Sequence, residues 1–276
     1  MITTFDMLLD EDAVFGDITS ETIIPEGLDA ESKVIAKEEG IVAGLNYLKE
    51  NVEKIGLKVT LLKRDGDSVK RGDSVAVIEG NARKLLLIER VFLNILGRMS
   101  GIATATKRLV DRVKRVNPNV RIAATRKTLL GKLDKIAVTI GGGDPHRWSL
   151  SDHILIKDNH IALVGLEEAI KKARRSSFVR KIEVEVERVE DAFKAVDLGA
   201  DIIMFDNFKP NQISEVVKLF EARGLRDRVL LEASGGISEE NISDYAESGV
   251  DVISIGALTH STRSLDFSID TTPKRN

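Results

Sequence analysis

The fold class follows from residues 201–236, which read DIIMFDNFKPNQISEVVKLFEARGLRDRVLLEASGG. Residues 201–205 contain the apolar run Ile202-Ile203-Met204-Phe205 and have the length of a buried β-strand, and residues 229–232 are a second candidate strand. Between them, residues 210–223 form an amphipathic stretch that is typical of a helix. A strand, a helix and a second strand in this order predict parallel strands joined by a crossover helix.

The same alternation extends to both sides of this segment. Further strands are expected at residues 121–124, 154–156, 181–186 and 251–255, with amphipathic stretches at 188–198 and 238–248. Six strands connected in this way suit an open doubly wound sheet or a βα-barrel. Reactive residues collect at the strand ends of a barrel, and they do so in this chain, which favours the barrel.

The chain before residue 121 has a different pattern. Short strands are expected at 34–36 and 59–62 within a region of strands and turns, residues 30–80. Asn81 is placed to cap a helix that begins near Ala82 and carries apolar residues at helical spacing. Ser100-Gly101 predicts a break in this helix, and a second helix is expected from Thr104 to Val116.

Length and composition limit the classes of protein. The 276 residues suit two modest domains, or one barrel with an extension, and 42% of them are hydrophobic, which is enough for a sizeable core. The chain has no cysteine, which excludes disulfides, thiol nucleophiles and Cys-ligated metals. A net charge of −3 argues against a general nucleic-acid binder. Charged residues make up 31% and no stretch approaches about 18 consecutive apolar residues, so we expect no membrane span. Residues 1–11 lack a basic segment, so we expect no signal peptide. The absence of cysteine is consistent with a cytoplasmic location, which we expect.

Residues 121–160 differ from the rest of the chain in charge. They contain seven Lys and Arg against four Asp and Glu, a local excess of three positive charges, and three of the four histidines. Charge runs of this kind usually form a solvated face. Here the cations lie beside Gly141-Gly142-Gly143 and at the ends of apolar strands, which indicates a pocket for an anion.

Every expected strand ends in reactive or small residues. Glu183, Glu185 and Glu187 alternate along one strand and therefore share a face. Inside a barrel these carboxylates would need cations or a metal beside them. Asp206 ends an otherwise apolar run, and a charge at that position is more often functional than structural. The remaining strands end in Thr125-Arg126-Lys127-Thr128, Lys157-Asp158-Asn159-His160, Glu232-Ala233-Ser234-Gly235-Gly236 and Gly256-Ala257.

Two glycine-containing strand ends predict a phosphate site. Ser234-Gly235-Gly236 is expected to open a helix, whose free N–H groups would bind an anion. Gly256-Ala257 at the next strand end is expected to form the second half of that site. The histidine spacing does not match usual zinc ligand patterns. Mg²⁺ held by substrate phosphates and one or two carboxylates is the expected metal.

The ordered motifs of the chain resemble those of the quinolinate phosphoribosyltransferase family (nicotinate-nucleotide pyrophosphorylase, carboxylating). The resemblance runs nearly end to end. One departure concerns Asp144-Pro145, since the family often has Asn directly before the His-Arg pair. The motifs are Phe15-Gly16-Asp17-Ile18-Thr19, Glu89-Arg90, Ser100-Gly101-Ile102-Ala103-Thr104, Thr125-Arg126-Lys127-Thr128, Gly141-Gly142-Gly143, His146-Arg147, Ile156-Lys157-Asp158-Asn159-His160, Glu183-Val184-Glu185-Val186, Phe205-Asp206-Asn207-Phe208, Ser234-Gly235-Gly236-Ile237 and Ser254-Ile255-Gly256-Ala257-Leu258-Thr259-His260.

The resemblance implies a two-domain α/β fold. An N-terminal open-faced α/β sandwich would span residues 1–104, and an incomplete α/β barrel of about six strands would span 105–264. A tail, 265–276, would pack on the N-terminal domain. A homodimer is also implied, with Arg90 entering the site of the neighbouring subunit.

The resemblance further implies that the enzyme transfers phosphoribosyl from phosphoribosyl pyrophosphate to quinolinate with decarboxylation, in NAD biosynthesis. Quinolinate would be bound by Arg90, Arg126, His146 and Arg147, and Thr125 would also contact substrate. The implied catalytic residues are Lys127, Lys157, Glu185 and Asp206. The last two of these would face the ribose hydroxyls and Mg²⁺. The 5′-phosphate would be held by Ser234, Gly235, Gly236 and Gly256.

Other functions remain as alternatives. One is a phosphoribosyltransferase for nicotinate that acts without decarboxylation, and another is a molybdate-transport-associated homologue with the same fold. A barrel that senses phosphorylated metabolites without catalysis is a third, although anion binding alone would not need Glu185 and Asp206. Arg126-Lys127 could also be a salt-bridged strand end that only supports the fold. The full set of cations favours quinolinate.

Overall fold

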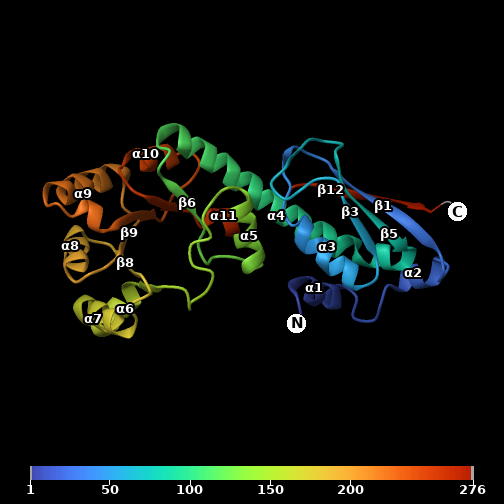
Figure 1. The fold of residues 1–276 in the computed structure, drawn as a ribbon, viewed down its shortest axis with the longest axis horizontal. Helices are drawn as coiled ribbons and strands as arrows, with labels where there is room; N and C mark the ends of the chain where they lie inside the picture. The colour runs from blue at the N-terminus through green and yellow to red at the C-terminus, as the bar shows by residue number, and fades with distance from the viewer. Residues whose placement is uncertain (1, 275–276) are drawn as a thin grey trace. The chain divides into compact units, whose positions relative to one another are not determined.

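The computed structural model describes residues 2–274 (Figure 1). The described chain divides into two compact units. The first unit contains residues 2–107, 129–142 and 262–274, and the second contains 108–128 and 143–261. The segment 129–142 thus packs with the first unit, although it lies within the range 105–264 that the resemblance assigns to the barrel.

The first unit is built on a four-stranded antiparallel sheet. The strand order is β12-β1-β5-β3. β12 comes from the end of the chain and pairs with β1 along its length, with Val34 opposite Ile269. Residues of β1 alternate between buried and more exposed positions, as expected for a sheet with one covered face. The strands are β1 (Asp29–Ala36), β3 (Lys58–Leu61), β5 (Ser74–Asn81) and β12 (Phe267–Pro273), with a separate pair β2 (Gly40–Ile41) and β4 (Ser68–Val69).

One long helix replaces the two that the sequence predicts. α4 runs without interruption from Ala82 to Val116, so the expected break at Ser100-Gly101 is wrong. A Cβ on Gly101 would lie 2.1 Å from the carbonyl oxygen of Arg263. Glycine is therefore needed for close approach of another backbone segment and does not end the helix. The other helices of this unit are α1 (Thr4–Asp12), α2 (Ile18–Ile23), α3 (Leu45–Lys54) and α5 (Lys132–Ile140).

The second unit contains the predicted parallel sheet. Its order is β6-β11-β10-β9-β8-β7, and every pairing is parallel. Each strand overlaps a range expected from the sequence. No pairing among the described residues joins β6 to β7, so the sheet stays open, as an incomplete barrel requires. The strands are β6 (Arg121–Ala123), β7 (Ile154–Ile156), β8 (Ile182–Val186), β9 (Ile202–Asp206), β10 (Leu230–Ser234) and β11 (Val252–Ser254).

Helices cover the apolar face of this sheet. α7 contacts β7 and β8, and α8 contacts β8 and β9 (Figure 1). Val184, Ile203 and Leu231 are fully buried in adjacent strands. Along each strand, the residues directly before and after these three point to the opposite face of the sheet, where the site lies. The helices are α6 (Asp158–Val164), α7 (Leu166–Ser176), α8 (Val189–Asp197), α9 (Pro210–Ala222), α10 (Ile242–Glu247) and α11 (Ala257–His260), with a 3₁₀ turn η1 (Arg226–Arg228).

None of the helices within residues 2–274 combines the length and apolar character that crossing a membrane requires.

Candidate active site

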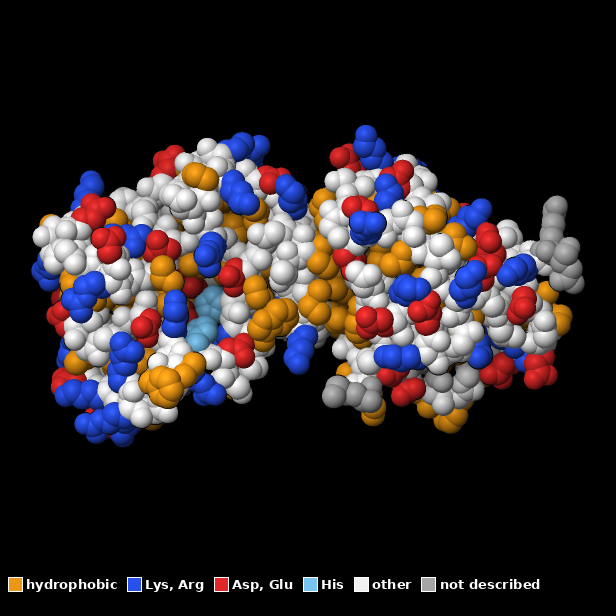
Figure 2. All heavy atoms as spheres, viewed as in Figure 1, with side chains coloured by type: hydrophobic (Ala, Val, Ile, Leu, Met, Phe, Trp, Pro, Cys, Tyr) orange, Lys and Arg blue, Asp and Glu red, His pale blue; other side chains and the backbone are white. Residues whose placement is uncertain are grey.

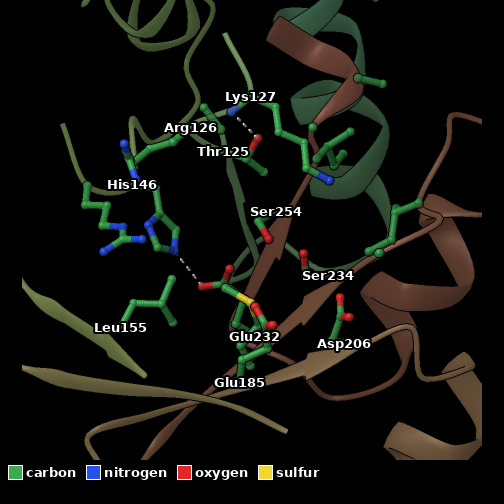
Figure 3. A pocket seen from close by; sticks show the side chains of 18 of the residues that line it. Thr125, Arg126, Lys127, His146, Leu155, Glu185, Asp206, Glu232, Ser234 and Ser254 are labelled. Carbon is green, nitrogen blue, oxygen red and sulfur yellow. Dashed lines mark hydrogen bonds and ion pairs between the residues drawn. The ribbon is translucent and has the colours of Figure 1, made fainter. Parts of the chain in front are cut away.

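A cavity of about 610 Å³ lies at the carboxyl ends of the six parallel strands. Every strand contributes a residue from its end or the following loop, and the whole lining belongs to the second unit. Figure 3 shows Arg126 and His146 on one side of the pocket and Ser234 and Asp206 on the other. The predicted site residues in its lining are Thr125, Arg126, Lys127, His146, Arg147, Lys157, Glu185, Asp206, Ser234, Gly235, Gly236 and Gly256.

Arg90 is the one predicted site residue outside this lining. It lies on α4 in the first unit and is exposed. The structure therefore brings together the predicted residues that follow Ala123, and it does not bring Arg90 into the same chain's pocket lining.

Cations crowd one wall of the pocket. Burial lowers the pKa of Arg147, and the nearby positive charge of Arg126 lowers it further. Like charges held this close repel each other, so the arrangement favours an anion between them. Figure 2 shows histidine atoms on this face of the second unit with Lys and Arg side chains around them.

The loop before His146 sets the direction of that side chain. Asp144 forms an isolated parallel bridge with Ala123, and its carboxylate accepts the His146 N–H at 2.7 Å. His146 has a φ of 55°, in the left-handed region that L-residues rarely adopt. Asp144 thus stabilises an uncommon backbone conformation at a pocket residue.

Acidic side chains also line the pocket. Lys157 Nζ forms an ion pair with Glu185, which supports the expectation that inward carboxylates require cations beside them. The Asp206 carboxylate accepts a hydrogen bond of 2.8 Å from Asn207 Nδ2. Glu187 is exposed, so the three alternating glutamates do not share one environment.

The predicted phosphate segment has a different local structure from the one expected. Ser234-Gly235-Gly236 does not open a helix, because α10 begins only at Ile242. Instead, Gly235 has a φ of 86° and packs on Asn207, whose Oδ1 would lie 2.2 Å from a Cβ at that position. Asn207 itself has a φ of 59°, and its N–H donates to the Ser234 carbonyl at 2.9 Å. Two loops thus hold each other in place at this end of the pocket.

A buried network lies beneath His146. Its Nε2 is 3.2 Å from Glu232 Oε2 (Figure 3). The same nitrogen is 3.6 Å from Glu183 Oε1. Glu183 Oε2 is 2.6 Å from His153 Nε2. Both carboxylates are almost inaccessible to solvent, with 0% and 2% exposure for Glu183 and Glu232.

The network changes the charge states of its members. Burial alone would lower the pKa of His146, but its contacts with Glu183 and Glu232 outweigh burial and raise the pKa to about 10. Burial alone would raise the pKa of Glu183, but the two histidines lower it to about 2. Burial raises the pKa of Glu232. His146 is therefore an imidazolium at neutral pH.

Sequence reasoning did not assign Glu232, His153 or His260 to the site. Glu232 and His260 line the pocket, and the ring of His153 lies 5.3 Å from the ring of His146, centroid to centroid. A signal existed for Glu232, since it ends an apolar run as Asp206 does. No residue next to His153 in the sequence indicates its role, because its partner, Glu183, lies 30 residues further along the chain.

Both halves of the chain match one family. The N-terminal domain of quinolinate phosphoribosyl transferase matches residues 17–100, and its C-terminal domain matches 102–270. The chain belongs to the quinolinate phosphoribosyl transferase family. This membership agrees with the family that the sequence motifs indicate.

Relatives of the family are similar over almost the whole chain. A probable nicotinate-nucleotide pyrophosphorylase [carboxylating] from Methanocaldococcus jannaschii is 49% identical and covers 95% of this chain and 94% of its own. The rat nicotinate-nucleotide pyrophosphorylase [carboxylating] is 34% identical and covers 90% of this chain and 84% of its own. The crystal structure of NadC from Streptococcus pyogenes has a TM-score of 0.89 at 37% identity, and covers 99% of this chain and 96% of its own.

One group in this family member has the geometry of metal ligands. His146, His153 and Glu183 place their ligand atoms within 4.8 Å of one another, and no second such group occurs among residues 2–274. In the structure these atoms form the hydrogen bonds and ion pairs of the buried network. Glu185 and Asp206, which both line the pocket, offer the oxygen ligands that Mg²⁺ prefers.

Proposed function

We propose that this protein transfers the phosphoribosyl group of phosphoribosyl pyrophosphate to quinolinate and releases CO₂. The products are nicotinate mononucleotide and pyrophosphate, and the step belongs to de novo NAD biosynthesis. One observation carries the proposal: in a member of this family, cations for a dicarboxylate and carboxylates for a ribose meet in one pocket.

The quinolinate end of the pocket is the wall of cations. Arg126 and Arg147 repel each other without a ligand, and a dicarboxylate would compensate both charges. Arg suits this role because its planar fork binds a carboxylate bidentately. His146 would add a third positive charge beside them. Arg90 would be supplied by a second copy of the chain, in a homodimer.

The phosphoribosyl end lies across the pocket. Ser234, Gly235, Gly236 and Gly256 would hold the 5′-phosphate, and Thr125 would contact substrate beside them. Lys127 and Lys157 would lie between the carboxylates of quinolinate and the pyrophosphate. A Cβ on Gly256 would lie 3.5 Å from Lys127 Cδ, so the absence of a side chain at Gly256 leaves room next to this cation.

Glu185 and Asp206 would face the ribose hydroxyls and hold Mg²⁺. Both carboxylates line the pocket and fit a hard cation, so the donor set agrees with this metal. When bound, Mg²⁺ would neutralise charge on the pyrophosphate. Lys157 already pairs with Glu185, which keeps opposite charges together where the sugar would lie.

The reaction needs positioning more than proton transfer. The pyridine nitrogen attacks the anomeric carbon, and the bond from that carbon to the pyrophosphate oxygen breaks with its electron pair leaving on oxygen. Glu185 and Asp206 stabilise the oxocarbenium character of the sugar, and Lys127 stabilises the leaving group. The ring nitrogen becomes cationic, and it stabilises the electron pair left on the ring when the adjacent carboxylate departs as CO₂. A proton from solvent then fills that ring position.

We propose a cytoplasmic location for this activity, since its substrates are soluble metabolites.

One assay tests the function. The purified protein is incubated with quinolinate, phosphoribosyl pyrophosphate and Mg²⁺, and nicotinate mononucleotide and CO₂ are measured. A parallel reaction replaces quinolinate with nicotinate, and another omits Mg²⁺. We expect product only with quinolinate and the metal. Turnover of nicotinate without turnover of quinolinate would show that the substrate is wrong.

A further inference from the structure

His153 is not part of the pocket lining, yet it contacts the most deeply buried charge beneath it. Its Nε2 lies 2.6 Å from Glu183 Oε2. Its ring lies 5.3 Å from the ring of His146, tilted by 48°. The His153 side chain is 19% exposed and comes from the loop that precedes β7, whereas Glu183 lies on β8.

Glu183 and Glu232 share His146 as a partner. The Oε1 atoms of both glutamates are buried and accept no hydrogen bond from the described residues. His146 Nε2 lies 3.2 Å from Glu232 Oε2 and 3.6 Å from Glu183 Oε1, so it is within reach of both carboxylates. Without another partner for Glu183, the two buried carboxylates would compete for the single Nε2–H of His146, and one buried charge would be left uncompensated.

His153 supplies that second partner. With His153 bound to one oxygen, Glu183 leaves His146 Nε2 to its closer contact with Glu232. The ring of His146 then has a defined orientation. Within the described chain, the hydrogen bonds of His146 are made by its backbone N–H and its Nε2, which leaves Nδ1 for a ligand in the pocket that the residue lines. An imidazolium held by Nε2 can donate its Nδ1–H to a ligand.

We propose that His153 is a positioning residue for substrate recognition, which acts through Glu183 to orient His146 toward a carboxylate of the bound substrate. This inference rests on the proposed function, because that carboxylate is taken to be one of quinolinate. The role proposed for His153 differs from that of His146, because His146 would contact the substrate and His153 would not.

A pair of substitutions at His153 tests the proposal. His153→Ala removes the partner of Glu183, and His153→Gln retains a hydrogen-bond donor. We expect His153→Ala to raise the KM for quinolinate by roughly tenfold or more, the effect of losing one hydrogen bond to a charged group. The KM for phosphoribosyl pyrophosphate should change little, and His153→Gln should recover most of the loss. Ser151→Ala is the matched control, because Ser151 is exposed in the same loop.

Quinolinate binding by calorimetry, together with a thermal melt of each variant, separates recognition from folding. If His153→Ala melts like the wild type and binds quinolinate as tightly, the proposal is overturned. A loss in which both KM values and the melting temperature change together, without recovery in His153→Gln, would assign His153 a merely structural role. If the wild-type protein itself does not turn over quinolinate, the proposed function fails and the positioning role fails with it.

The same three side chains could instead be metal ligands. Elemental analysis of the purified wild-type protein for Zn, Mn and Fe tests this reading. We expect less than stoichiometric metal. If the wild type contains one equivalent of metal and His153→Ala does not, the change in KM for quinolinate comes from loss of a metal, and the proposed positioning role is overturned.

Discussion

At the scale of single residues, the pocket depends on groups whose charge is set by close contacts with oppositely charged neighbours. His146 combines a left-handed backbone with contacts to two buried carboxylates. A non-glycine residue in that region costs about 1 kcal/mol or more. Asp144 and Glu232 hold it at its two ends, through the backbone N–H and through Nε2. Strain of this kind is common at functional sites.

The charge of His146 predicts how stability depends on pH. Its pKa in the folded protein is about 10, against an ordinary value of 6.5. The protonated form is therefore favoured by folding, and this contribution is fully present below 6.5 and is lost as the pH rises to 10. We expect the wild type to lose more free energy of unfolding between pH 6 and pH 10 than His146→Asn does. Urea denaturation of both proteins at both pH values measures the difference, and equal losses would contradict it.

Lys127 provides a test of catalysis that is separate from folding. Its side chain is exposed and lines the pocket, and its described hydrogen bonds are made by the backbone. We expect Lys127→Ala to change the free energy of unfolding by no more than about 0.5 kcal/mol. Turnover should fall by about 10²–10³-fold, as when a stabilising group is removed from a transition state. A folded variant with normal turnover would show that the residue only supports the strand end.

At the scale of elements, the carboxyl ends of β9 and β10 are locked together by their following loops. Gly235 and Asn207 both have positive φ, and the amide of Asn207 fills the space beside Gly235. The phosphate end of the pocket is thus shaped by contact between two loops. It does not depend on the N-terminus of a helix.

A pair of glycine substitutions tests this contact. In Gly235→Ala the new Cβ would meet Asn207 Oδ1 at 2.2 Å and its backbone nitrogen at 2.9 Å. We expect a loss of about 1–3 kcal/mol in stability and a raised KM for phosphoribosyl pyrophosphate. Gly224→Ala is the control, because Gly224 has a φ of 65°, has nothing within 4 Å of the new Cβ and lies outside the pocket. It should lose about 1 kcal/mol with no change in KM.

At the scale of the whole molecule, the proposed dimer has a direct test through Arg90. Arg90→Ala and Lys127→Ala proteins are mixed, unfolded together and refolded. In a mixed dimer, the site that retains Lys127 would receive Arg90 from the other chain and be complete. We expect each variant alone to be nearly inactive and the mixture to recover about a quarter of wild-type activity, because half the dimers are mixed and each has one complete site.

The separate variants, treated in the same way and pooled only before the assay, are the control. Light scattering of the refolded sample checks that dimers are present. Without recovery in a sample that is dimeric, Arg90 does not act across subunits.

Local patterns predicted much of this fold. The alternation of apolar runs with amphipathic stretches located all six strands of the second unit, and the residues at their ends line one pocket. Periodicity and strand ends are properties of neighbouring residues, and so they can be read along the chain. The same reading failed at Ser100-Gly101, because the backbone that approaches Gly101 comes from residues 263–264.

The sequence by itself determined the α/β class, the family and the strand ends that carry cations and carboxylates. Only the tertiary structure decided that Gly101 lies inside a continuous helix and that Ser234-Gly235-Gly236 packs on Asn207. It also decided that His153 pairs with Glu183 beneath His146. These features depend on contacts between segments far apart in the chain, and the carboxylates that raise the pKa of His146 come near it only after those segments have packed.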